Sequence, residues 1–151
     1  MIVLLDAGPL GLVTNPMASK EAEACNRWLD TMIDGGQSVL VPEIADYEVR
    51  RELIRANKKP GIRRLNDLRE AIGYVPLDTK TMEAAASFWA EARNRGQQTA
   101  DDKALDCDMI LVAQAFCYPA APNDPIVIAT TNVRHLSIFA DARRWDDISI
   151  P

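Results

Sequence analysis

The chain has 151 residues, of which 48% are hydrophobic and 26% charged, a composition typical of a folded globular protein and unlike that of disordered or fibrous chains. This length allows a buried core without staples, so we expect a single domain over residues 1–151. The net charge of −5 would repel a polyanion, so a nucleic-acid role requires a local basic patch or bound metal ions.

The cysteines suggest neither a disulfide framework nor a thiolate metal site, because Cys25, Cys107 and Cys117 are far apart in sequence. A reducing cytoplasm is therefore the expected location. The apolar start ends at Asp6, and no later run reaches the roughly 18 apolar residues that a membrane span requires. We expect neither export nor membrane insertion.

The first predicted elements are a strand and a helix. Residues 2–5 form a continuous apolar run that is typical of a buried parallel strand, and residues 6–9 predict a turn. Ser19 is a suitable N-cap for an amphipathic helix, which the glycines at 35 and 36 end. Asp6 then lies at the carboxyl end of the first strand.

The middle of the chain continues this alternation. Residues 38–41 predict a second strand, and Pro42 can occupy the first turn of the helix that follows. A further helix is expected from about Pro60 to Ala71, and a brief strand at residues 74–77.

The last third begins with a helix that Thr79 or Thr81 can cap and that ends near Gly96. Residues 97–103 are polar and predict a loop. A helix with apolar residues at helical spacing follows, until prolines after residue 118 end it. Residues 126–129 predict a final strand, and the tail from Ser137 carries no clear pattern.

Strands separated by helices predict an α/β fold with a central parallel β-sheet of four to five strands, flanked by α-helices on both faces. Ligands of such sheets collect at the carboxyl ends of the strands. Asp6 and Asn132 both follow predicted strands. Thr130 and Thr131 join Asn132 in a polar cluster, where hydroxyl groups can contact water, metal-bound acids or phosphate.

Metal-assisted hydrolysis of a phosphodiester needs several hard oxygen ligands that converge on one cavity. Four residues have suitable chemistry and position: Asp6 after the first strand, Glu48 on the helix after the second, Asp108 near a helix start, and Asn132 after the last strand. A metal there would polarise the phosphate and activate a water molecule, which Glu48 or Asp108 could orient or deprotonate.

Each acid also has a plain structural interpretation. Asp6 is a common turn residue, and Glu48 could pair with Arg51 or Arg55 on an exposed helix face. Either Asp106 or Asp108 could cap the helix while the other points to the site.

Other polar residues compete with these candidates. Glu43 and Asp46 lie in the first turns of the same helix as Glu48, where solvated roles next to the helix dipole suffice for them. His135 is the single histidine and is assigned no catalytic role.

A basic stretch accompanies the Glu48 helix and suits either RNA phosphates or an acidic partner segment. It holds 8 of the 17 basic residues, namely Arg50, Arg51, Arg55, Lys58, Lys59, Arg63, Arg64 and Arg69.

Four segments together resemble the blocks of PIN-domain nucleases, and especially the VapC-type toxins of VapBC toxin–antitoxin pairs. In chain order they are LLDAGPL, ADYEVRREL, ALDCDMILVAQA and ATTNVRHL. Any one of these segments alone is unspecific. Four of them in this order, at compatible spacing in a chain of this length, are specific for the family. The resemblance touches nearly the whole chain, from Asp6 to His135.

The resemblance implies a PIN-like fold and a Mg²⁺-dependent endoribonuclease, in which Mn²⁺ can replace Mg²⁺. It implies that Asp6, Glu48 and Asp108 bind the metal, and it selects Asp108 over Asp106. Asn132 corresponds to a position where many members carry a fourth acid. The resemblance also implies a cognate antitoxin that covers the active site and a homodimer.

Alternative functions are less well supported. Phosphatases of the haloacid-dehalogenase type need a second acid two residues after the first, where this chain has Gly8. The main alternative is a PIN-type module that binds RNA or protein with weak or no cleavage. Whether one or two metal ions act is left open, because Asn132 would be a neutral ligand.

Overall fold

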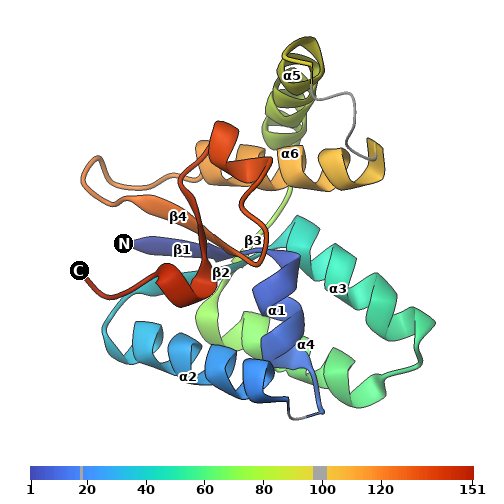
Figure 1. The fold of residues 1–151 in the computed structure, drawn as a ribbon, viewed down its shortest axis with the longest axis vertical. Coiled ribbons are helices and arrows are strands. Elements are labelled where there is room, and N and C mark those ends of the chain that lie inside the picture. Colours follow the sequence, from blue (N-terminus) through green and yellow to red (C-terminus); the bar gives the residue numbers. More distant parts are fainter. Residues whose placement is uncertain (18, 97–101) are drawn as a thin grey trace.

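The computed structural model describes residues 1–17, 19–96 and 102–151. At its centre is a five-stranded sheet in which every pairing is parallel, with the strand order β3-β2-β1-β4-β5 (Figure 1). The α/β prediction, with four to five parallel strands and helices on both faces, is confirmed. The strands are β1 (Ile2–Leu5), β2 (Ser38–Pro42), β3 (Tyr74–Val75), β4 (Ile126–Thr130) and β5 (Ala142–Arg144).

Helices cover both faces of the sheet. In Figure 1, α1, α2 and α4 lie on one face, α6 lies on the other, and α5 stands against α6. Helix α3 follows β2 and contacts helices of both layers. The helices are α1 (Ala7–Thr14), α2 (Lys20–Asp34), α3 (Glu43–Arg55), α4 (Lys59–Ile72), α5 (Thr79–Asn94) and α6 (Asp102–Cys117), with short 3-10 helices η1 (Leu136–Ile138) and η2 (Trp145–Asp147).

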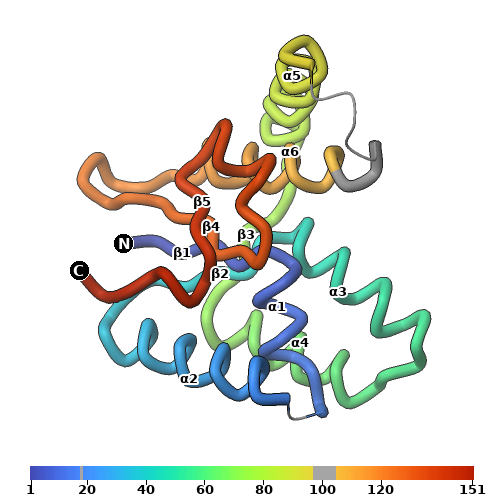
Figure 2. The backbone as a smooth tube through the Cα atoms, viewed as in Figure 1, coloured from blue at the N-terminus to red at the C-terminus, as the bar shows by residue number. Residues whose placement is uncertain are grey.

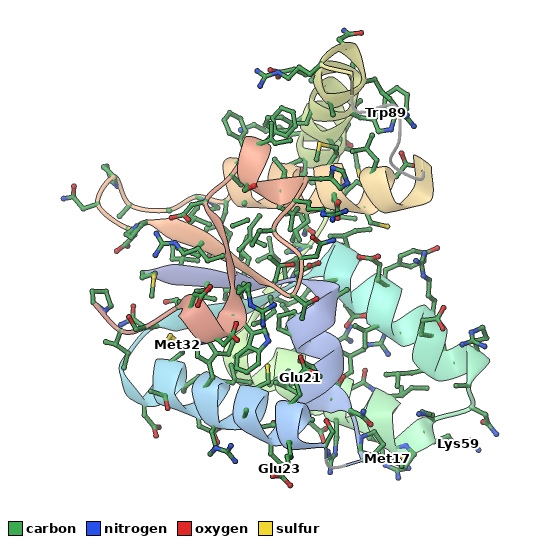
Figure 3. The ribbon with its side chains drawn as sticks, in the orientation of Figure 1. Met17, Glu21, Glu23, Met32, Lys59 and Trp89 are labelled. Carbon is green, nitrogen blue, oxygen red and sulfur yellow. The ribbon has the colours of Figure 1, made fainter. Side chains whose placement is uncertain are left out.

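Strand β1 shows why its sequence is apolar without alternation. Val3 and Leu5 face one hydrophobic cluster, which Met32 of α2 also joins, as Figure 3 shows beneath the sheet. Ile2 and Leu4 face the other cluster, under α5 and α6. A central strand buried on both faces needs apolar side chains at every position.

Helix α1 is a feature that the sequence interpretation missed, because residues 6–9 were expected to form a turn. Asp6 instead caps the helix, and its Oδ1 accepts the N–H of Ala7 at 2.7 Å. Pro9 is tolerated because it lies in the first turn, where backbone N–H groups have no partner within the helix.

Most other predicted elements are confirmed, with shifted ends. Ser19 caps α2 as expected, through the N–H of Ala22 at 3.0 Å. For α5, Asp78 provides the cap, accepting the N–H of Thr81 at 2.7 Å, so the choice of Thr79 or Thr81 was wrong. Asp and Thr are both good caps, and only the backbone geometry decides between them.

The predicted polar loop at residues 97–103 falls mainly on residues 97–101, which lie outside the described part. Its last two residues already belong to α6, which begins at Asp102. Asp106 and Asp108 therefore lie inside this helix and neither caps it. Strand β5, with η1 before it and η2 after it, was not predicted.

Both chain ends lie on the side of the sheet where the strands begin, away from the carboxyl ends of the strands (Figure 2). Among the helices of the described part, none has the length and apolar character needed to cross a membrane.

Candidate functional site

Asp6 is fixed by two hydrogen bonds at the junction of β1 and α1. Besides the Ala7 N–H on Oδ1, its Oδ2 accepts the hydroxyl of Thr130 at 2.6 Å. Thr130 is fully buried at the end of β4, which pairs with β1. Burial raises the pKa of Asp6, and the two hydrogen bonds oppose that rise because they stabilise the carboxylate.

Glu48 reaches the same place from α3. Its side chain is 24% exposed, and Arg51 lies 3.8 Å away, so the expected surface pairing is present but loose. Burial and the charge of Asp6 raise the pKa of Glu48, whereas a hydrogen bond from Cys107 and the charge of Arg51 lower it. The influence of Asp6 means that these two carboxylates lie within electrostatic range of each other.

Asp108 completes the cluster from α6. Burial, then Asp6 and then Glu48 raise its pKa to about 7. Like charges around a half-buried carboxyl disfavour its ionised form. The structure thus brings together three of the four predicted site residues, from β1, α3 and α6. We call Asp6, Glu48 and Asp108 the acid cluster.

The acid cluster has a suitable donor set for a divalent cation. Its three carboxylates are hard oxygen donors of the type that Mg²⁺ prefers, and they repel one another, which a cation would relieve. Each Asp6 oxygen has one protein donor and keeps a free lone pair. Within the described residues, however, no three such side chains are arranged to hold a metal as they stand. Ligation therefore requires the carboxylates to close together.

Asn132 lies two residues after the end of β4, at the carboxyl end of that strand, as expected. Its side chain is exposed, and its Oδ1 accepts the N–H of Arg134 at 3.3 Å in a local turn. Its backbone N–H donates to Thr130 Oγ1 at 2.9 Å. Asn132 is thus connected to Asp6 through Thr130. A contact between this polar cluster and an acid was expected. The side-chain amide of Asn132, however, is not part of the acid cluster.

Cys107 is a site residue that the sequence interpretation missed, because it was considered only for disulfides and thiolate metal sites. It is buried, it directly precedes Asp108 on α6, and it and Glu48 influence each other's pKa. Burial and Glu48 raise the pKa of Cys107 to about 12, so the thiol stays protonated. Its position directly before Asp108 was the available signal.

Asp46 is buried, which contradicts its expected solvated role. Arg50 Nε lies 2.6 Å from Asp46 Oδ1, and Arg69 Nη1 lies 3.8 Å from Oδ2. Glu43 is also engaged, since it accepts the N–H of Leu77 at 2.5 Å. Acids in a first helical turn need not be solvated when cations of a neighbouring helix face them, and Arg69 comes from α4. Two members of the basic stretch therefore have structural roles.

A groove of about 460 Å³ begins beside Glu48 and runs between α1 and α3. Gly11, Val49 and Leu53 supply apolar surface in it. Basic side chains from the stretch described above line it too, namely Arg51, Arg55 and Lys58. Lys59 lies just beyond, on the outside of the molecule (Figure 3).

A parallel sheet of this order, with acids from β1, α3 and α6 near the carboxyl end of its central strand, defines an α/β protein with a candidate metal site. No family model and no curated protein matches the sequence. Solved structures do match over nearly the whole chain. The fold is the PIN-domain fold, as the four sequence segments predicted.

Three of these structures show the extent of the similarity. VapBC2 from Rickettsia felis, bound to a promoter DNA fragment, matches with a TM-score of 0.71 and 13% identity over 97% of this chain and 100% of that chain. FitAcB from Neisseria gonorrhoeae matches with a TM-score of 0.67 and 18% identity over 97% and 99%. VapBC-1 from nontypeable Haemophilus influenzae matches with a TM-score of 0.65 and 12% identity over 97% and 100%.

Proposed function

We propose that this chain is a Mg²⁺-dependent endoribonuclease that acts as the toxin of a cytoplasmic toxin–antitoxin pair. The observation that carries the proposal is the convergence of Asp6, Glu48 and Asp108 beside the central strand, in a fold shared with VapBC and FitAcB structures. Three carboxylates held near one another against their mutual repulsion have a chemical purpose if a cation joins them.

The residues divide the work as follows. A Mg²⁺ or Mn²⁺ ion, when bound, supplies Lewis-acid activation of the scissile phosphate and of the attacking water. Asp6, fixed by Ala7 and Thr130, is the rigid ligand. Glu48 and Asp108 are the ligands that close on the ion. In the absence of the ion, Asp108 can hold or release a proton at its carboxyl group near neutral pH, because its pKa is raised to about 7.

The groove between α1 and α3 is where we place the antitoxin. Its apolar surface and its three basic side chains, against the two acids Glu48 and Glu52 in the same lining, fit a protein segment that is apolar on one side and acidic at its edges. Since the groove begins at Glu48, a bound segment would also block access to the acid cluster. Arg55→Glu with Lys58→Glu should weaken the complex at least tenfold in calorimetry. Arg27→Glu is the control, because Arg27 is an exposed residue of α2 that does not line the groove.

The homodimer is also part of this proposal. Phe116 of α6 is 74% exposed, and it packs edge-on against Phe88 of α5 with ring centroids 5.6 Å apart. So large an exposed aromatic side chain is suited to an interface. Sedimentation velocity of wild type and Phe116→Ser would test it, and dimers of equal stability in both would exclude this surface.

Ribonuclease activity is tested directly with structured RNA, in Mg²⁺ and in chelator, for wild type, Asp6→Asn and Asp108→Asn. The matched control is Asp106→Asn, because Asp106 is exposed and only two residues from Asp108. We expect cleavage by wild type and Asp106→Asn in Mg²⁺ alone. Cleavage in every sample would exclude the mechanism. No cleavage with retained RNA binding would instead favour the binding module.

A further inference from the structure

Tyr47 is an exposed aromatic residue of α3, directly before Glu48 of the acid cluster. It is 55% exposed, although a large ring is usually more stable when it is buried. Phe116, the other exposed aromatic residue of the described part, packs on the ring of Phe88. Tyr47 packs instead on a cation, because the guanidinium Cζ of Arg51 lies over its ring, 5.2 Å from the centroid. Its surroundings therefore differ from those of the proposed dimer surface.

Arg51 connects this ring to the acid cluster. Residues three and four apart are neighbours on a helix surface, so α3 presents Tyr47, Glu48 and Arg51 side by side. Arg51 Nη2 lies 3.8 Å from Glu48 Oε1, which is too long for a hydrogen bond. The Arg51 side chain is 46% exposed, so its N–H groups can bind another acceptor. The ring of Tyr47 thus lies one side chain away from the acids at which we place cleavage.

A single-stranded nucleotide has the two groups that this pair of side chains can bind. Its base has a flat π face, which stacks on an aromatic ring whatever the sequence. Its phosphate oxygens accept the parallel hydrogen bonds that a planar guanidinium donates. Bases inside a duplex are already stacked on one another, so only an unpaired base offers a free face. The contact between Arg51 and the ring holds both groups in place before a nucleotide arrives.

A protein segment is the other class of partner for such a pair, since tyrosine and arginine are common in protein interfaces. The position of Tyr47 favours the nucleotide. Glu48 and Arg51 line the groove between α1 and α3 in which we place the antitoxin, but Tyr47 is not among the described residues that line it. The ring is therefore outside the groove and beside the acid cluster.

We propose that Tyr47 and Arg51 form a nucleotide-binding subsite, in which Tyr47 stacks on an unpaired base and Arg51 binds a phosphate next to the scissile bond. The inference rests on the proposed ribonuclease function and names the substrate class more closely, as RNA that is unpaired at the cleavage site. Selection of unpaired over paired RNA then depends on one ring of α3.

The test measures the binding of labelled probes by fluorescence anisotropy, in chelator so that no cleavage occurs. One probe is a short oligouridine, and the other is its abasic analogue, which keeps the sugars and phosphates. Wild type should bind the oligouridine about 5- to 20-fold more tightly. Tyr47→Leu, which keeps an apolar side chain without a π face, should lose most of this preference, and Tyr47→Phe should keep it. Ile54→Ala should behave as wild type and is the matched control, because Ile54 is 62% exposed on the same helix.

Arg51→Ala tests the phosphate contact separately. It should weaken the binding of both probes equally and reduce the slope of log affinity against log salt by roughly 0.7, the value for one phosphate of a single strand. An unchanged slope would overturn the inference. Unchanged binding of both probes by Tyr47→Leu would also overturn it and would assign the ring to a protein interface, while oligouridine binding by wild type upholds RNA as the substrate. Absence of binding by wild type would overturn both proposals.

Discussion

Thr130 Oγ1 lies 2.6 Å from Asp6 Oδ2, across the parallel pairing of β4 with β1. This hydrogen bond joins residues 124 positions apart in the chain. It fixes the Asp6 carboxylate, which is central to the candidate site. Its donor is the hydroxyl of Thr130, a fully buried residue.

Replacing Thr130 by valine tests this link, because valine keeps the shape and removes the donor. We expect the free energy of unfolding to fall by about 1 kcal/mol and Mn²⁺ affinity to fall roughly tenfold, as calorimetry can measure. Thr130→Ser should restore the affinity. Thr14→Val is the control, since the buried Thr14 hydroxyl donates to a backbone carbonyl at 2.7 Å, that of Leu10. Unchanged affinity in Thr130→Val would show that Asp6 needs no second donor.

Asp108 should make a contribution to stability that decreases with rising pH. The folded-state pKa of Asp108 is raised from 3.8 to about 7, so the folded chain binds more protons than the unfolded chain between these values. In chelator, the contribution of Asp108 to the free energy of unfolding should therefore be highest below pH 4 and fall as pH rises to 7. Water screens part of the repulsion, so we expect a contribution on the order of 1 kcal/mol.

Asp108→Asn should flatten that pH dependence and raise the melting temperature at pH 8 by about 2–4 °C in chelator. Mg²⁺ should stabilise wild type and have little effect on the variant, because a ligand that binds only the folded state shifts unfolding. Calorimetric melts between pH 4 and 8 measure both effects. An identical pH dependence in the two proteins would contradict the assignment.

Gly8 is required by close packing near the site. A Cβ at this position would lie 2.4 Å from Thr131 Oγ1 and 2.9 Å from its Cγ2. Gly8→Ala should therefore cost about 1–2 kcal/mol and reduce cleavage, because α1 would shift with its cap Asp6. Adding Thr131→Ala should recover most of the loss. In the same helix, Gly11→Ala meets only Val49 Cγ2 at 3.9 Å and should be neutral or stabilising in chemical denaturation.

Asp46 should be essential for stability and dispensable for catalysis. Asp46→Ala leaves Arg50 without its partner at 2.6 Å, and breaking a buried pair costs about 3–5 kcal/mol. Glu52→Ala breaks the exposed pair with Arg55 and should cost less than about 1 kcal/mol. Urea unfolding compares the two. Rates per folded molecule should stay near wild type in Asp46→Ala, and a selective loss of rate would give Asp46 a place in the site.

The sequence predicted the parts of this fold that depend on local pattern. Continuous apolar runs indicate buried strands. Ser19 and the glycines at 35 and 36 indicate the two ends of α2. Helix α1 was missed because Asp6 before a glycine and a proline is equally typical of a turn and of a capped helix. Strand β5 was missed because Ala142–Arg144 has two exposed arginines and lies at the edge of the sheet.

In the candidate site, too, the sequence predicted some features and not others. Asp6, Glu48 and Asp108 were predicted from residue type, position and resemblance, and the structure brings them together. Which acid Thr130 contacts was not predictable, because it depends on the pairing of β4 with β1. The influence of Cys107 on Glu48 was not predicted, because it depends on how α6 packs beside α3. Burial of Asp46 also depends on Arg69 of another helix.

The strand order has a consequence for the timing of biosynthesis. Strand β1 emerges first from the ribosome, yet it pairs on one side with β4, whose last residue is Thr130. Asp6 therefore gains its second hydrogen-bond donor only after most of the chain has been synthesised. Asp108 is also synthesised late, in the last third of the chain. A nascent chain that is still being translated before this point has acids but no assembled cluster.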